Sequence, residues 1–293
     1  MGQQDEERQP VSSNRTCWGI YRESAHSPGR VDDDAAIMRR VAEALSARGY
    51  NVELLTADNV EPAFQVPGAL IFAMCEQGDI LDRLKKAGEN GAIIVNSPEA
   101  IRNTYRHRMV ELFAQRHVLA PVSHVVATNA IKLPPATSVW IKRYDFHATQ
   151  SDDVMYVASE TGFRQALGQF AERGIPFVVA QEHVEGDLIK FYGVGRAGGE
   201  PLVSDWFEWF YHRDKGMTGY AFGVDRLHQV ARSAAAALGV EIFGGDAIIR
   251  RDGEPVIVDL NAWPSYAKFR DKAAQAIADY LAHRFHRGPR AVI

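Results

Sequence analysis

The sequence has few of the features that identify secreted, membrane-spanning or disulfide-rich proteins. It contains 2 cysteines in 293 residues, Cys17 and Cys75, and both lie in apolar surroundings. This usage indicates buried thiols in a reducing, cytoplasmic setting, with a single disulfide between them as the alternative. No run of about 18 apolar residues occurs, so we expect no membrane-spanning segment.

A surplus of positive charge is also absent. The chain has 33 Lys and Arg residues against 37 Asp and Glu residues, which gives a net charge of -4 and no basic footprint for nucleic acid. We therefore expect a small-molecule substrate, no nucleic acid, no membrane, and a monomer or homodimer. Residues 1–15 are polar and lack the apolar core of a signal peptide, so we expect a disordered leader there.

Strand-like and helix-like patterns alternate through residues 16–97, with short glycine-containing connections. Such alternation predicts an N-terminal domain with a parallel sheet covered by helices. Parallel sheets bind ligands at the carboxyl ends of their strands, here residues 21–30 and 75–78. For Arg22, His26 and Arg30, a ligand-binding role and a solvated loop stay open as alternatives.

Two apolar runs near the C-terminus, 247–249 and 256–258, flank a turn-forming stretch and predict a β-hairpin. We expect Asp246 to open the first strand, and Asp259 with Asn261 to close the second, so that the three side chains converge. Two carboxylates and an amide oxygen form a hard, oxygen-only set that suits Mg²⁺ shared with nucleotide phosphates. The alternative is a solvated hairpin with ordinary turn acids.

The order Asp246, Asp259-x-Asn261 and then 263–266 (WPSY) resembles the magnesium-binding end of ATP-grasp enzymes. It looks most like the inositol 1,3,4-trisphosphate 5/6-kinase branch and is also similar to glutathione synthetase-type ligases. Much of the superfamily has Glu where this chain has Asp259. The resemblance implies ATP and Mg²⁺ as cofactors, with two metal ions and with Mn²⁺ as a possible substitute.

The resemblance also implies an α/β (α+β) fold of the ATP-grasp type. The N-terminal parallel α/β domain, residues 16–97, is then followed by an ATP-grasp domain, residues 98–293. Within the latter, a central subdomain at about 122–185 and a C-terminal subdomain at about 186–293 clamp ATP between them.

Candidate nucleotide-binding residues come partly from the residues and partly from the resemblance. Arg106 and Arg108 are two apart on a predicted helix and do not share a face, so one of them can turn inward. Lys142 ends an apolar strand, where an ammonium needs an anion. The resemblance gives Arg106 and Lys142 contacts with the nucleotide, residues 181–184 the adenine hinge, and Glu185 or Asp187 the ribose. The full expected set is Arg106, Lys142, Gln181, Glu182, His183, Val184 and Asp187.

Candidate catalytic residues follow the same resemblance. The segment 147–149 (HAT) is similar to the His-Gly-Thr of the inositol kinases and makes His147 a candidate beside the transferred phosphate, although a solvated loop histidine is the alternative. Lys190 stands in the Lys-x-Tyr-x-Val-Gly pattern of those kinases, where related ligases place an arginine. We expect Lys190 and His147 near the γ-phosphate, and Arg213 or the region of Ser265 near the acceptor.

Three functions compete at this stage. The first is a kinase that transfers a phosphoryl group from ATP to a hydroxyl of a small polyol or of a sugar or inositol phosphate. The second is an ATP-dependent carboxylate–amine ligase that acts through an acyl phosphate. The third is a non-catalytic nucleotide-binding regulator. Lysine at position 190 favours the kinase because a point charge suits a phosphate, whereas a planar carboxyl group suits arginine.

Overall fold

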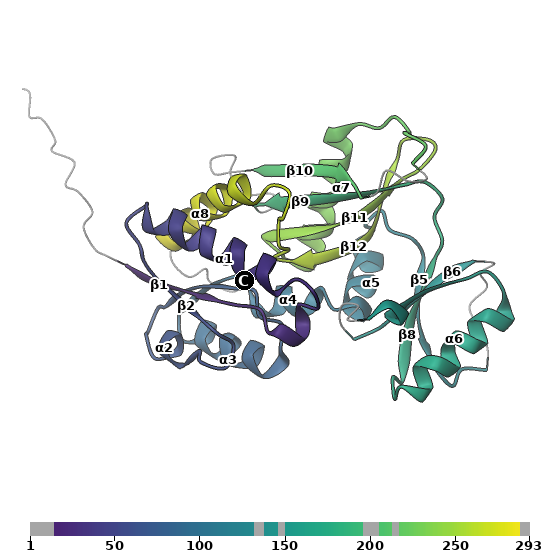
Figure 1. Ribbon diagram of the computed structural model, residues 1–293, viewed down its shortest axis with the longest axis horizontal. Coiled ribbons are helices and arrows are strands. Elements are labelled where there is room, and N and C mark those ends of the chain that lie inside the picture. The colour runs from purple at the N-terminus through teal and green to yellow at the C-terminus, as the bar shows by residue number, and fades with distance from the viewer. Residues whose placement is uncertain (1–14, 132–137, 146–149, 196–204, 213–216, 288–293) are drawn as a thin grey trace, which may run out of the picture.

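The protein is built on three four-stranded sheets that follow one another along the chain (Figure 1). The structure, a computed structural model, describes residues 15–131, 138–145, 150–195, 205–212 and 217–287. The expected leader therefore falls almost wholly outside the described residues. The mixture of one parallel and two antiparallel sheets confirms the predicted α/β (α+β) class.

The first sheet is parallel and has the strand order β2-β1-β3-β4. Alternating apolar strands and amphipathic helices produce it, as the sequence predicts. Cys17 and Cys75 are both buried and free, so the alternative of a disulfide between them is wrong. The elements are β1 (Thr16–Ile20), η1 (Ser24–His26), α1 (Val31–Ser46), β2 (Asn51–Leu55), α2 (Glu61–Phe64), β3 (Leu70–Ala73), α3 (Gly78–Glu89) and β4 (Ile93–Val95).

Two short helices connect the first sheet to the second, α4 (Pro98–Asn103) and α5 (Arg106–Gln115). Ser97 caps α4, because its hydroxyl accepts a hydrogen bond of 3.2 Å from the backbone N–H of Ala100. Pro98 occupies the first turn, where a missing N–H costs nothing. Ser followed by Pro is therefore a local sequence signal for the start of this helix.

The second sheet is antiparallel and has the order β5-β8-β6-β7, with one helix packed on it. Its third strand in sequence, β7, was not predicted, because it has only four residues and follows directly on a three-residue 3-10 helix, which leaves a weak pattern in the sequence. The elements are β5 (Ser123–Ala127), β6 (Val139–Arg143), η2 (Ser151–Asp153), β7 (Val154–Val157), α6 (Glu160–Glu172) and β8 (Phe177–Glu182).

The third sheet is also antiparallel and has the order β10-β9-β11-β12. The predicted hairpin is its β11–β12 pair, and β12 lies at the edge. The elements are β9 (Asp187–Val194), β10 (Trp206–Tyr211), α7 (Val224–Leu238), β11 (Ile242–Ile249), β12 (Pro255–Ala262) and α8 (Arg270–His286).

The hydrophobic cores join the first and third sheets into one body. One core cluster combines residues of β3, α3 and α4 with residues of α7, β11 and β12, and a second combines α1 and β1 with α8. In Figure 1, α8 from the C-terminal end lies beside α1. The second sheet has a core of its own with α6. The second sheet and α6 are therefore packed around a separate core.

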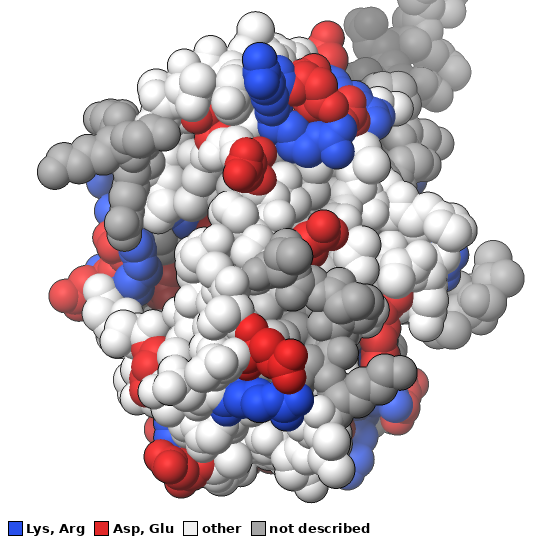
Figure 2. All heavy atoms as spheres, turned by 90° about the vertical axis from the view of Figure 1, so that its right-hand side faces the viewer, with Lys and Arg blue, Asp and Glu red and all other residues white. Residues whose placement is uncertain are grey.

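Figure 2 shows acidic and basic side chains in small mixed groups on the face that carries the second sheet. Within the described ranges, every helix is too short or too polar to cross a membrane.

Candidate functional site

The strand register brings the two expected acids together on one face of the third sheet. Asp246 of β11 lies directly opposite Asp259 of β12. Directly opposed residues of an antiparallel pair project to the same face, and Asn261 joins them because it lies two residues beyond Asp259. One detail of the prediction was wrong: β11 begins at Ile242, so Asp246 lies within the strand and does not open it.

Two glycines explain why the start of β11 was missed. Gly244 and Gly245 weaken the strand pattern in the sequence, yet the sheet requires them. A side chain on Gly244 would lie 2.7 Å from both Tyr192 and Pro264, and one on Gly245 would lie 2.3 Å from the carbonyl of Asp259. Close packing around the acids therefore depends on residues that look like a turn in the sequence.

A lysine lies beside the first acid. Lys190 of β9 is opposite Asp246, and its Nζ lies 2.8 Å from Asp246 Oδ1. Both side chains are less than one third exposed. The lysine offsets the repulsion that two opposed carboxylates would otherwise experience. The sequence analysis proposed both residues but did not predict this pair.

The amide of Asn261 completes an oxygen-rich set that fits a hard divalent cation. Its Oδ1 is buried and accepts no hydrogen bond from the described residues. Asp259 Oδ1 accepts the Leu260 N–H at 3.1 Å, and its side chain is 21% exposed. The described ranges contain no cluster of three His, Cys, Asp or Glu side chains suited to a metal. Two carboxylates and one amide oxygen can still hold Mg²⁺ when phosphate oxygens supply further ligands.

Lys142 of β6 faces these acids from the second sheet. It is 8% exposed, and its Nζ donates to Gln181 Oε1 at 2.6 Å and to the carbonyl of Val258 at 3.4 Å. Burial is the main reason that its pKa falls from 10.5 to about 8; nearby Arg106 also lowers it, while Asp259 and Asp246 oppose the fall. A buried ammonium of this kind is suited to receive a phosphate group.

Arg106 turns inward and Arg108 turns outward, which is the arrangement that their spacing allows. Arg106 is 4% exposed, donates to the carbonyl of Arg143 at 2.7 Å and lies 3.9 Å from Asp259 Oδ2. Arg108 pairs with Glu99 at the surface. Arg106, Lys142 and Lys190 thus surround the acid pair with positive charge from three different elements.

The expected adenine hinge divides into two parts. Gln181 lies within β8 and bonds to Lys142, while the N–H groups of Glu182 and His183 donate to the carbonyls of Val122 and Ser138. The backbone of Val184 makes no hydrogen bond with the described residues. Val184 therefore has both its N–H and its carbonyl available to a planar base.

The sequence analysis missed an aromatic group beside this hinge. Trp140 Nε1 donates to His183 Nδ1 at 3.0 Å, and the Tyr156 ring lies 5.2 Å from Trp140 and 5.1 Å from His183. Trp140 lies two residues before Lys142 on β6 and therefore shares its face. This spacing was the signal that could have identified it.

Asp187 has a different role from the expected ribose contact. It is 2% exposed, and its carboxylate accepts three backbone N–H bonds of 2.6 to 2.8 Å from Thr218, Gly219 and Tyr220. Burial raises the pKa of Asp187, but these three bonds outweigh it and lower the pKa below the ordinary value. Asp187 fixes the segment before α7, which leaves Glu185 as the remaining ribose candidate.

Two expected catalytic residues, His147 and Arg213, lie outside the described residues. A groove of about 670 Å³ between α1 and the start of α8 lies apart from the site. It is lined by exposed charged side chains such as Arg40, which pairs with Glu43 and Asp271. Lys142 belongs to the second sheet and the two acids to the third, and none of them lines this groove. We therefore place the site between the second and third sheets.

Comparison with known proteins identifies the fold. No protein-family model and no curated protein matches the sequence. Solved structures do match. VanG D-Ala:D-Ser ligase from Enterococcus faecalis is 14% identical, with a TM-score of 0.65 over 93% of this chain and 100% of that chain.

Two further structures agree. D-alanine–D-alanine ligase from Bacillus anthracis complexed with ATP is 12% identical, with a TM-score of 0.62 over 93% of this chain and 96% of that chain. A RimK domain ATP-grasp protein from Sphaerobacter thermophilus is 18% identical, with a TM-score of 0.60 over 84% and 95%. The chain therefore has the ATP-grasp fold.

Proposed function

Because the chain has the ATP-grasp fold, we propose that it is an ATP- and Mg²⁺-dependent ligase that joins a carboxylate to an amine through an acyl phosphate. The observation that carries this proposal is the strand register, which places Asp246, Asp259 and Lys190 together on one face. The ligases among the structurally similar proteins support the choice of reaction.

Each converging residue has a role in this proposal. The backbone of Val184 binds the adenine, with Trp140 and Tyr156 nearby, and Lys142 and Arg106 bind the phosphates. A phosphate group near Lys142 replaces Gln181 as partner of the buried ammonium and restores its pKa toward the ordinary value.

Asp246, Asp259 and Asn261 would hold magnesium in this proposal. When bound there, Mg²⁺ neutralises charge on the phosphate oxygens during transfer. The Oδ1 of Asn261 supports the assignment, because no described residue donates to it and a buried acceptor without a donor is unfavourable.

The reaction then follows ordinary acyl activation. A carboxylate oxygen of the acceptor attacks the γ-phosphorus, and the bond from that phosphorus to the bridging oxygen of ADP breaks. The amine next attacks the acyl carbon, inorganic phosphate leaves, and the amine loses a proton. Lys190 lies beside Asp246, where its charge can stabilise the transferred phosphoryl group.

Transfer to a hydroxyl is a second candidate, and one observation favours it. The cation paired with Asp246 is a lysine, whose ammonium acts as a point charge, whereas an arginine would bind a planar carboxyl group in a bidentate manner. The motif formed by Asp259, Asn261, Trp263, Pro264 and Tyr266 also resembles that of the inositol kinases.

A trapping assay separates the two reactions. The protein is incubated with Mg·ATP and pools of carboxylic acids, amines and polyol phosphates, with and without hydroxylamine. A ligase releases phosphate only with an acid present and forms a hydroxamate with hydroxylamine, because hydroxylamine captures the acyl phosphate. A kinase forms a stable phosphorylated product and no hydroxamate. If neither nucleotide binding nor ATP turnover is observed, both proposals are wrong.

A further inference from the structure

The strand that carries two of the proposed metal ligands lies at the edge of its sheet. β12 pairs with β11 on one side, and the sheet order ends there. Edge strands leave backbone groups without a ladder partner, so something else must satisfy them and fix the strand. In this protein, the carbonyl of Leu119 accepts the Ile257 N–H at 2.8 Å, and side chains from the second sheet and from the loop after β1 donate to carbonyls farther along.

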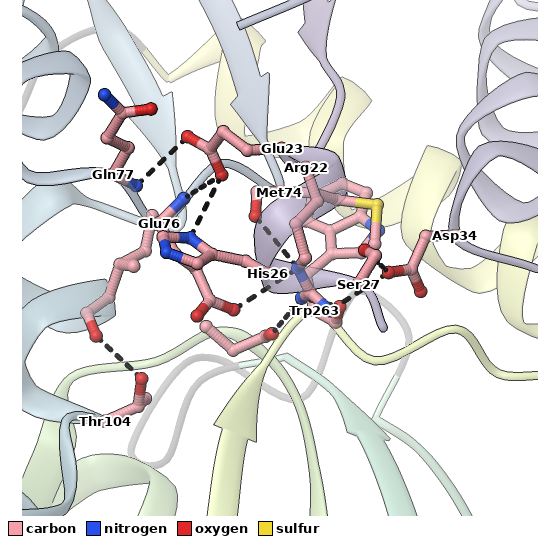
Figure 3. Close-up of polar contacts among 12 residues, drawn as sticks. Arg22, Glu23, His26, Ser27, Asp34, Met74, Glu76, Gln77, Thr104 and Trp263 are labelled. Atoms are coloured by element: carbon pink, nitrogen blue, oxygen red, sulfur yellow. Dashed lines mark hydrogen bonds and ion pairs between the residues drawn. The ribbon is translucent and has the colours of Figure 1, made fainter. Parts of the chain in front are cut away.

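These side chains contact β12 on both sides of Asp259 and Asn261. Before them, the carbonyl of Val258 accepts hydrogen bonds of 3.4 Å from both Lys142 and Gln181 of the central sheet. After them, Arg22 Nη2 donates to the carbonyls of Ala262 at 3.2 Å and Trp263 at 2.9 Å (Figure 3). The metal-site residues therefore lie between two contacts that originate outside their own sheet.

Arg22 is itself firmly held. Its Nη1 lies 3.2 Å from Asp34 Oδ2, and its Nε lies 3.3 Å from both the carbonyl of Met74 and Glu76 Oε1. Figure 3 shows the guanidinium between these groups and Trp263. The arginine side chain is 12% exposed. Because its donors are engaged within the protein, it is suited to fix a strand and not to bind a substrate.

The carboxylates around Arg22 are fixed in turn. Glu23 accepts the backbone N–H groups of Glu76 and Gln77, each at 3.0 Å, and Ser27 donates to Asp34 at 2.5 Å. These bonds tie the carboxyl ends of β1 and β3 to the start of α1. The N-terminal sheet thus presents Arg22 to β12 from a rigid support.

The turn that follows Asn261 also needs such support. Trp263 is fully buried, has a φ of 44° and stacks on Phe72 of β3 with ring centres 5.8 Å apart. A bulky residue rarely adopts this left-handed conformation unless its surroundings hold it. Arg22 and Phe72 hold it from the same sheet.

We propose that Arg22 is a positioning residue for the metal site. By fixing the carbonyls of Ala262 and Trp263, it sets the direction in which Asn261 presents its Oδ1. This inference rests on the proposed function, because it assumes that Asn261 is a magnesium ligand.

Metal binding with a non-hydrolysable nucleotide tests the proposal without turnover. Mn²⁺ is titrated into the protein with an ATP analogue whose β,γ-bridge is an imido group, and free Mn²⁺ is measured by electron paramagnetic resonance. Groups that orient metal ligands typically contribute about 10- to 100-fold in affinity. We therefore expect Arg22→Met to weaken Mn²⁺ binding by about that factor. Arg22→Lys should weaken it less, because lysine keeps the positive charge and can still donate, although it lacks the planar fork.

Arg284→Met is the matched control. Arg284 is also 12% exposed and also forms an ion pair, with Glu241 Oε2 at 2.8 Å, but it lies on α8 away from Asn261. We expect this variant to bind Mn²⁺ within about 3-fold of the parent protein, a change far below that expected for a group orienting a ligand.

Arg22→Lys keeps a positive charge beside Asp34 and Glu76, so it tests the proposal even if Arg22→Met does not fold. The proposal is overturned if the folded Arg22 variants bind Mn²⁺ as tightly as Arg284→Met. If the parent protein itself fails to bind Mn²⁺ with the nucleotide, the metal assignment fails. The two failures are therefore distinguishable.

Discussion

Lys142 gives the sharpest test of the site, because burial of its charged ammonium is unfavourable until an anion binds or the group loses its proton. The perturbation is Lys142→Met, which keeps the length and volume of the side chain but removes its charge. The variant also leaves Gln181 Oε1 without its donor, which costs about 1 kcal/mol. The pH dependence of stability is a cleaner measure than stability at one pH.

The magnitude follows from the pKa of Lys142, which burial lowers from 10.5 to about 8. This difference corresponds to about 3 kcal/mol between the two protonation states. Below about pH 8, the lysine is charged in both the folded and the unfolded chain, and the folded state carries the whole penalty. As the pH rises toward 10.5, the unfolded chain binds more protons than the folded one, so stability rises and the penalty disappears.

We therefore expect the parent protein to gain about 2 kcal/mol relative to Lys142→Met between about pH 7 and about pH 9.5. Urea unfolding of both proteins at several pH values measures this difference, since other titrating groups cancel. Lys272→Met is the control, because that lysine is 71% exposed and its loss should not change the pH dependence. A constant difference between parent and Lys142→Met would refute the argument that Lys142 is buried as an unrelieved charge.

Bound ATP should raise the pKa of Lys142, so nucleotide affinity should fall above about pH 8 in the parent and not in the variant.

Three further variants test other parts of the site. Asp259→Asn should lower turnover by at least about 100-fold, because a metal in this position contributes several kcal/mol, and a normal rate in a steady-state assay would remove Asp259 from the metal site. Lys190→Met should lower kcat by about 100-fold and change the Kd for ATP little, as a calorimetric titration can show; equal losses in both would mean that Lys190 binds ground-state nucleotide. Asp187→Asn should destabilise the protein by about 1 to 3 kcal/mol above about pH 4, because the three N–H bonds favour the carboxylate. The pKa of Asp187 is lowered on folding, so this difference in stability should shrink as the pH falls below about 4 and the carboxylate becomes protonated. A difference that stays constant in chemical unfolding at low pH would contradict the assignment.

Much of the fold could be predicted from local patterns. The strand and helix alternation of residues 16–97, the hairpin and the Ser97 cap all follow from periodicity and capping residues, and the structure contains them. The short strand β7 and the start of β11 were missed, because four residues, or a segment with two glycines, carry too weak a pattern.

The sequence alone determined which side chains share a face within one element. Asp259 and Asn261 point the same way because side chains along a strand repeat every two residues. Arg106 and Arg108 point apart because residues two positions apart on a helix lie on different faces. These relations depend only on local backbone geometry, so no knowledge of the neighbours is needed.

Only the tertiary structure decided which elements meet. The sheet order places Lys190 opposite Asp246, core packing directs Arg106 inward, and the edge of β12 receives Lys142 from one sheet and Arg22 from another. The residues of each such pair are more than 50 positions apart, and local patterns carry no information on which strand becomes the neighbour of another. That choice results from burying the apolar faces of all three sheets at once, which no single segment specifies.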